Sequence, residues 1–306
     1  MDKNIFKVKG TYVNGQWFNS KNSYEVFNPS NGEKLSDVPI SDRKELELAV
    51  ASAKKAQAVW SKTSLIERAK CLEELSKKIL AKEEEFALID SYDSGNAITG
   101  MRKDVKETVN NIRYFCGLVR EVKGETFSME KNHLNFTRYQ PYGVVLKINP
   151  FNHPFRFCVE KIAAPLLMGN SLIIKNSEQA PISSLRFCEL LDDIFPKGLI
   201  NVVTGGPENG KFLVEHPDIK RIAVIGSVGT GIAIAKGAAP LLKNVSLELG
   251  GKNPIIIFDD ADPDFAAGLA IKGMNLSRQG QSCSSTSRVL VNKKVKDKFL
   301  IYIPSQ

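Results

Sequence analysis

The chain contains 306 residues, of which 42% are hydrophobic and 25% are charged. These fractions are typical of a globular protein and exclude a disordered chain or a low-complexity fibre. The length predicts about two domains. The formal net charge is +8, but positive and negative residues alternate along the chain, so the charge pattern favours a solvated surface over a nucleic-acid-binding face.

The five cysteines are widely spread and form no Cys-x-x-Cys pair, and the chain has only three histidines. This composition supports neither a disulfide framework nor a zinc site, so no bound metal is expected. The first residues lack the apolar run of a signal peptide, and no stretch reaches the ~18 apolar residues of a membrane span. The sequence therefore predicts a cytoplasmic protein with no membrane partner.

Short strands and turns are expected in the first forty residues. Asn14-Gly15 is a hairpin-turn signal, and residues 28–32 form a second turn cluster. Helices follow, among them one that begins with the capping-box pair Ser64 and Glu67. Gly95 is expected to end this helical region.

Residues 123–142 fit neither pattern and predict a polar, protruding hairpin with strands near residues 124–127 and 134–139. Such an arm is a candidate for pairing with another subunit. The pattern alone is equally consistent with a plain surface excursion.

From Gly143 onward, short β-branched runs alternate with helical stretches. The expected strands are residues 144–146, 171–174, 201–203, 222–225 and 255–258. The expected helices are residues 155–168, 182–194, 208–215 and 231–242. This alternation predicts an α/β fold with a doubly wound parallel sheet that is covered on both faces.

Three clusters follow predicted strands, which is where ligands bind in open α/β sheets. In the run Asn149 to Pro154, a buried side-chain amide would donate to an oxyanion. The run Lys175 to Glu178 offers a cation and a carboxylate for ribose or phosphate. Residues 226–231 are rich in glycine, although they do not match G-x-G-x-x-G, and their backbone N–H groups would approach a pyrophosphate. Each cluster, taken alone, is also consistent with an ordinary turn or cap.

A fourth cluster combines a carboxylate with a thiol. Glu248 follows an apolar run, where a charge is costly to bury without a purpose. Cys283 lies in a Gly- and Ser-rich turn, which is the setting of an accessible nucleophile. The other cysteines lie in helical apolar contexts and are expected to be structural; they are Cys71, Cys116, Cys158 and Cys188.

Together these clusters resemble the NAD(P)-dependent aldehyde dehydrogenase superfamily. The resemblance extends from residues 14–17 and 27–32 to Arg288. Five patterns occur in the order of the family: Pro-Phe-Asn-x-Pro, Lys-x-x-Glu, Gly-Ser-x-x-x-Gly, Glu-Leu-Gly-Gly-Lys and Gly-Gln-x-Cys. The resemblance implies Cys283 as the nucleophile, Glu248 as the general base and Asn152 as the oxyanion-hole amide.

The resemblance also implies where the cofactor binds. Lys161 takes the place of a helix lysine near the cofactor, and Lys175 with Glu178 matches the ribose-binding pair. Gly226 and Ser227 match the pyrophosphate loop, and Glu248 also lies on the cofactor side. The carboxylate of Glu178 favours NAD, with NADP as the alternative.

The implied activity is oxidation of an aldehyde to a carboxylic acid through a cysteine thiohemiacetal and a thioester. Residues 1–122 and 143–248 would form the dinucleotide-binding domain, residues 123–142 an oligomerisation hairpin, and residues 249–306 a partial catalytic domain. Family members are homo-oligomers and continue well past the nucleophile, so a C-terminally truncated chain is expected. The alternative function is a non-catalytic remnant that binds a dinucleotide or a partner protein.

Overall fold

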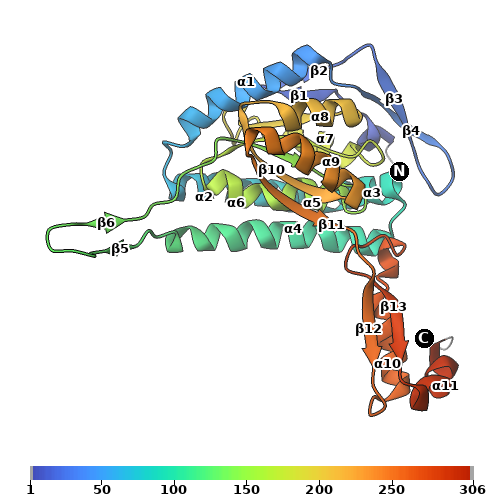
Figure 1. The fold of residues 1–306 in the computed structure, drawn as a ribbon. Helices are drawn as coiled ribbons and strands as arrows, with labels where there is room; N and C mark the ends of the chain where they lie inside the picture. The colour runs from blue at the N-terminus through green and yellow to red at the C-terminus, as the bar shows by residue number, and fades with distance from the viewer. Residues whose placement is uncertain (1–2, 304–306) are drawn as a thin grey trace. The chain divides into compact units, whose positions relative to one another are not determined.

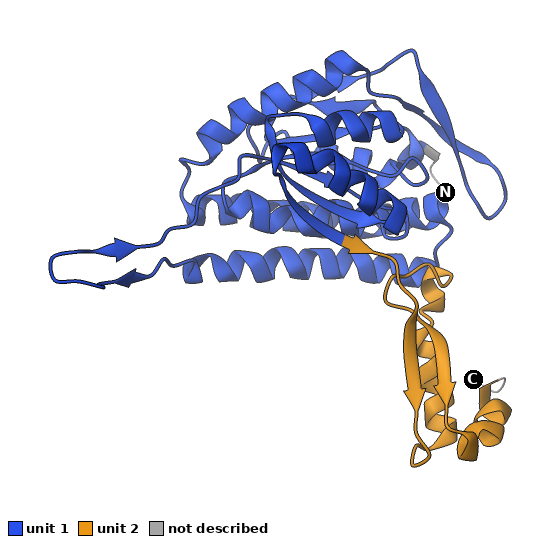
Figure 2. Cartoon of the chain, in the orientation of Figure 1, with its two compact units in different colours: residues 1–247 blue, residues 248–306 orange. Residues whose placement is uncertain are grey.

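A computed structural model describes residues 3–303. The chain divides into two compact units, residues 1–247 and residues 248–306 (Figure 2). The division lies one residue from the boundary expected between the two predicted domains. The functional assignment of the units remains a prediction.

A seven-stranded sheet forms the centre of the first unit (Figure 1). Its spatial order is β11 (Asn244–Leu249), β10 (Ile219–Gly226), β7 (Val144–Ile148), β8 (Ser171–Lys175), β9 (Ile200–Val203), β1 (Thr11–Val13) and β2 (Gln16–Phe18). Strands β10, β7, β8 and β9 pair in parallel, whereas β1 and β2 are antiparallel. The α/β fold with a mostly parallel sheet is confirmed.

Successive residues of each strand pack on opposite faces of the sheet. Leu146 and Ile173 belong to one core, which includes residues of α1 (Arg43–Trp60), α8 (Pro207–Glu215) and α9 (Val228–Ala238). Val145, Leu172 and Ile174 belong to the core on the other face. Its helices are α2 (Leu65–Ala81), α3 (Glu83–Ser94), α4 (Ile98–Leu118), α5 (Pro154–Val159), α6 (Ala163–Leu167) and α7 (Ile182–Phe187). The sheet is therefore covered on both faces, as predicted.

The local signals near the N-terminus are confirmed. Asn14-Gly15 joins β1 to β2, and the second turn joins β3 (Ser23–Phe27) to β4 (Lys34–Pro39). The Ser64 and Glu67 capping box forms at the start of α2. Gly95 ends α3 with φ 75°, a left-handed conformation that favours glycine.

Two helical stretches are shorter than expected. The stretch at 155–168 divides into α5, the 3-10 helix η3 (Glu160–Ile162) and α6. Pro165 lies in the first turn of α6, where its missing N–H is tolerated but cannot continue the preceding helix. The stretch at 182–194 ends as α7 and one 3-10 turn. The other 3-10 helices are η1 (Lys3–Phe6), η2 (Val119–Glu121), η4 (Cys188–Leu190), η5 (Ala239–Leu241) and η6 (Leu276–Arg278).

Residues 123–142 form the expected hairpin, with β5 (Thr126–Phe127) paired to β6 (Asn135–Phe136). It extends away from the helices of the first unit (Figure 1). The expectation of a polar surface is wrong, because several large apolar side chains are exposed on it: Phe127, Met129, Leu134, Phe136 and Tyr139.

The second unit contains a parallel pair of strands, β12 (Asn253–Ile257) and β13 (Thr286–Val291), and the helices α10 (Pro263–Gly273) and α11 (Lys293–Tyr302). A small core joins Ile257 to residues of both helices. The strand expected at 255–258 therefore belongs to a separate two-stranded sheet. A continuous apolar run predicts a buried strand but does not identify its partner.

Two buried acids on α3 hold the beginnings of two helices on the same face of the sheet. Asp90 accepts a hydrogen bond from the backbone N–H of Phe155 at 3.0 Å, and Asp93 accepts one from Ile182 at 2.9 Å. Burial raises the pKa of Asp90 to about 7 and the pKa of Asp93 well above its usual range. The nearby Asp104 carboxylate also raises the pKa of Asp90.

This burial predicts a pH-dependent stability. Because the pKa of Asp90 is about 7 in the folded chain and ~3.9 when unfolded, the folded chain holds the proton more tightly and loses stability as pH rises between these values. Asn at position 90 can still accept a hydrogen bond from Phe155 and cannot ionise. Across that pH range we therefore expect the stability of Asp90→Asn to rise relative to that of the wild type by about 4 kcal/mol.

Urea unfolding followed by the fluorescence of Trp17 and Trp60, at several values between pH 4 and pH 7.5, measures the effect. Asp193→Asn is the control, because that carboxylate is 91% exposed. If the unfolding free energies of Asp90→Asn and the wild type changed with pH in the same way, the prediction would be contradicted.

Candidate active site

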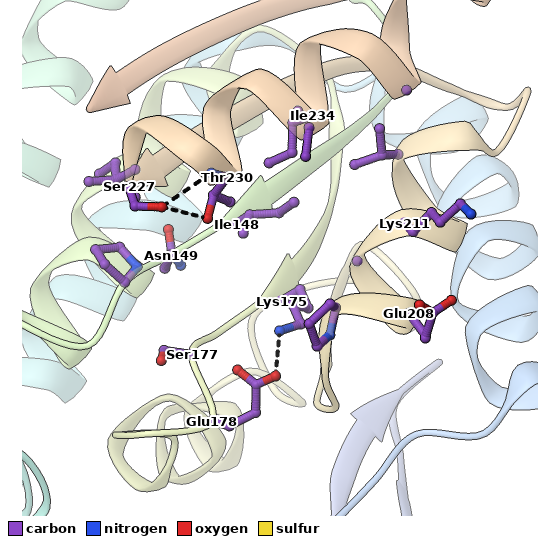
Figure 3. A pocket seen from close by; sticks show the side chains of 18 of the residues that line it. Ile148, Asn149, Lys175, Ser177, Glu178, Glu208, Lys211, Ser227, Thr230 and Ile234 are labelled. Carbon is purple, nitrogen blue, oxygen red and sulfur yellow. Dashed lines mark hydrogen bonds and ion pairs between the residues drawn. The ribbon is translucent and has the colours of Figure 1, made fainter. Parts of the chain in front are cut away.

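A cavity of about 800 Å³ lies at the carboxyl ends of three neighbouring strands, β10, β7 and β8 (Figure 3). In the sheet, β7 and β10 are neighbours. From β7 the chain continues to β8, which lies on the side of β7 away from β10, and from β10 it continues to β11, which lies on the side of β10 away from β7. The strand order therefore reverses between β7 and β10, which is where open α/β sheets bind their ligands.

The wall that follows β8 carries an ion pair. Nζ of Lys175 lies 3.2 Å from Oε1 of Glu178, and the two side chains are 8% and 36% exposed (Figure 3). The carboxylate is close to the chain before α8, since a Cβ placed on Gly206 would lie 3.7 Å from its Oε1. Lys175 and Glu178 thus offer a donor and an acceptor suited to ribose hydroxyl groups.

The wall that follows β10 is the beginning of a helix. Ser227 caps α9, and its Oγ accepts a hydrogen bond from the backbone N–H of Thr230 at 3.1 Å (Figure 3). The N-terminal end of a helix carries a partial positive charge and exposed N–H groups, which favour phosphate. Gly226 and Ser227 line the same cavity as Lys175 and Glu178, so the structure brings these four predicted residues together.

The turn after β7 contributes Asn149, Pro150 and Phe151 to the cavity. Asn152 is half-buried in the same turn, outside the set that lines the cavity. Its backbone oxygen accepts a hydrogen bond from Nδ2 of Asn96 at 3.0 Å.

The next residue of this turn is also anchored to the helical layer. Nδ1 of His153 lies 2.6 Å from Oδ2 of Asp104 on α4. Sequence reasoning missed Asp90, Asn96 and Asp104 as supports of the turn. For the two acids, the available signal was a carboxylate within the apolar face of its helix, α3 for Asp90 and α4 for Asp104.

Lys161 is exposed in η3 and does not line the cavity. A different lysine is buried nearby: Nζ of Lys147 on β7 donates to the carbonyl oxygens of Phe157 and Cys158, both at 3.0 Å. Burial lowers the pKa of Lys147 to about 8. A lysine within the apolar run of β7 is the sequence signal that could have identified it.

In the second unit, Cys283 lies in the loop between η6 and β13 and is exposed. Nδ2 of Asn253 donates to the backbone oxygen of Cys283 at 2.7 Å and to that of Ser285 at 3.2 Å. These bonds attach the loop to the start of β12. The expected accessible turn is therefore present.

The remaining cysteines are less accessible. Cys116, Cys158 and Cys188 are buried, and Cys71 is partly buried. Burial raises the pKa of the Cys116 thiol to about 11 and that of the Cys158 thiol to about 12.

Glu248 corrects an expectation. It lies within β11, not after a strand, and its side chain is exposed. β11 is an edge strand of the sheet. A side chain on such a strand has a neighbouring strand on only one side, so the carboxylate of Glu248 can remain in contact with water.

Within residues 3–303, no group of three or more His, Cys, Asp and Glu side chains is arranged to hold a metal ion. In that same range, no helix combines the length and the apolar composition needed to cross a membrane.

Comparison with known proteins identifies the family. The model of the aldehyde dehydrogenase family matches residues 17–303. Aldehyde dehydrogenase tropH of Talaromyces stipitatus is 37% identical over 294 residues, which are 94% of this chain and 57% of that protein. The chain therefore spans less than two thirds of the length of this relative.

Solved structures agree with the sequence comparison. Betaine aldehyde dehydrogenase of Staphylococcus aureus in complex with NAD+ is 34% identical with a TM-score of 0.95, over 99% of this chain and 61% of that one. An NADP dependent enzyme of E. coli is 28% identical with a TM-score of 0.95, over 99% and 64%. From its sequence match over nearly the whole described range and from its fold, this chain belongs to the aldehyde dehydrogenase family.

Proposed function

We propose that this chain supplies the dinucleotide site and the cysteine nucleophile for NAD-dependent oxidation of an aldehyde to a carboxylic acid. The observation that carries the proposal is the cavity at the switch point of the sheet, which gathers Lys175, Glu178, Gly226 and Ser227. These are the positions that match the family's cofactor site.

The donors and acceptors of the cavity fit a dinucleotide. Glu178 would accept hydrogen bonds from ribose hydroxyl groups and Lys175 would donate to them, while the beginning of α9 at Ser227 would hold the pyrophosphate. Bound NAD would supply the acceptor for the hydride that leaves the substrate.

The other assigned residues would perform the chemistry of acyl transfer. Sγ of Cys283 would add to the aldehyde carbonyl, because a thiol ionises more readily near neutral pH than an alcohol. The amide of Asn152 and the backbone N–H of Cys283 would stabilise the oxyanion. After oxidation, Glu248 would activate the water that hydrolyses the thioester on Cys283.

The substrate would be a small-molecule aldehyde, with betaine aldehyde and a semialdehyde as the candidates. We place the protein in the cytoplasm, without nucleic-acid or membrane partners. The hairpin at residues 123–142 would pair with another copy of the chain in a homo-oligomer, which would cover its exposed apolar side chains.

A second candidate is a non-catalytic protein that binds a dinucleotide or a partner protein without turnover. It is favoured by the cavity, whose lining residues all belong to the first unit.

Cofactor preference provides the first test. The charge of Glu178 should repel the 2′-phosphate of NADP, so we expect calorimetric titration to show NAD bound about tenfold more tightly. Glu178→Ser should narrow this ratio, while Glu130→Ser in the hairpin, a carboxylate that is 77% exposed, should not. Equal affinities of the wild type for NAD and NADP would contradict the assignment.

Thiol reactivity provides the second test. We expect iodoacetamide to alkylate Cys283 first, because its thiol is exposed whereas Cys158 is buried with a raised pKa. Mass spectrometry of native chains should show that Cys283→Ala removes the fast phase and Cys158→Ala retains it. In a chain extended to the length of its relatives, Cys283→Ala should also abolish aldehyde oxidation and ester hydrolysis. Wild-type rates in that variant would refute the nucleophile assignment.

Turnover by the chain alone provides the third test. Catalysis needs the reacting groups held within about 0.5 Å by their surroundings, and the relatives supply more chain than residues 1–306 contain. We expect these 306 residues to bind a dinucleotide weakly and to produce no measurable NADH from NAD and aldehyde. Reduction of NAD at ordinary dehydrogenase rates by a monodisperse sample would overturn this expectation.

A further inference from the structure

Two buried asparagines meet where strands β7 and β8 end. The strands run in register up to Ile148 and Lys175. One residue later, Nδ2 of Asn149 donates to Oδ1 of Asn176 at 3.0 Å, and the backbone N–H of Asn149 donates to the oxygen of Lys175 at 3.1 Å. The two asparagines are only 5% and 6% exposed.

Beyond this pair the two segments separate and become different walls of the cavity. The chain after Asn149 continues into Pro150 and Phe151, and the chain after Asn176 continues into Ser177 and Glu178. The bond between the two amides therefore links the walls directly at the point of separation. Removal of either amide would leave a buried polar group of its partner unsatisfied, which is costly.

Asn149 lines the cavity, whereas Asn176 does not. We propose that Asn176 is a positioning residue: through Asn149 it fixes the turn after β7 relative to the Lys175–Glu178 pair, and so sets the geometry in which one ligand spans both walls. The ligand identity rests on the proposed function, because that ligand is the dinucleotide.

The same two strands provide a matched control at their opposite ends. Asn170 precedes β8, is 3% exposed, and accepts a hydrogen bond from the backbone N–H of Gly143, which precedes β7, at 3.1 Å. Its Nδ2 donates to the oxygen of Pro165 at 2.9 Å. Asn170 therefore links β7 to β8 as Asn176 does, but at the amino ends of the strands, away from the cavity.

Calorimetric titration of the 306-residue chain with NAD and with AMP tests the proposal. We expect Asn176→Leu to weaken NAD binding about tenfold and AMP binding much less, because AMP does not extend along both walls. Asn176→Asp keeps an acceptor for Asn149 and should restore most of the NAD affinity. Asn170→Leu should lower the melting temperature comparably and leave both affinities unchanged.

Hydrogen exchange of the unliganded chain gives a readout that does not depend on the cofactor. Asn176→Leu should accelerate exchange at residues 151–153 and 177–179, whereas Asn176→Asp and Asn170→Leu should not. Unchanged exchange there in Asn176→Leu overturns the proposal, as does an equal loss of NAD affinity in Asn170→Leu. A wild-type chain that binds no NAD refutes the proposed function instead, and the exchange measurement still decides the role of Asn176.

Discussion

Parallel pairing of β7 with β8 on one side and with β10 on the other determines where the chemistry of the first unit collects. Parallel strands end at the same edge of a sheet, so the segments that follow β7, β8 and β10 leave the sheet beside one another although they are remote in sequence. Each segment contributes one kind of group to the cavity: an amide turn at Asn149, an ion pair at Lys175 and a helix beginning at Ser227. Since the helices that follow β7 and β8 pack on one face and α9 packs on the other, the space between the segments stays open.

The helical layer behind the sheet holds these segments in place. Asp90 and Asp93 accept backbone hydrogen bonds at the beginnings of α5 and α7, which are the helices that follow the turn at Asn152 and the segment at Glu178. Asn96 and Asp104 hold the same turn from the connection and the helix that follow α3. Burial of acids opposes folding, but Asp90 and Asp93 each satisfy a backbone donor that begins a helix. The polar side chains of the α-helical layer thus support the edge at which the cavity lies.

Local patterns predicted most of the fold because their physical cause is local. The capping box at Ser64, the hairpin turn at Asn14-Gly15 and the helix end at Gly95 each depend on a few neighbouring residues. Strand partners were harder to predict, so the run at 255–258 was expected in the main sheet and pairs with β13 instead. The two runs that contain the four cofactor positions were identified from their places after predicted strands, and the family resemblance assigned the role of each residue. Asn176 was not singled out, because its contact with Asn149 depends on the register between two strands.

Lys147 has a consequence for the energetics of folding. Its Nζ meets two carbonyl oxygens, those of Phe157 and Cys158, which is the number of N–H donors that an uncharged amine offers. With a pKa of about 8 in the folded chain and ~10.4 when unfolded, this amine is mostly neutral near pH 9 and becomes charged when the chain opens. Unfolding at that pH therefore takes a proton from the buffer. The enthalpy that a calorimeter records for it must consequently change with the ionisation heat of the buffer chosen.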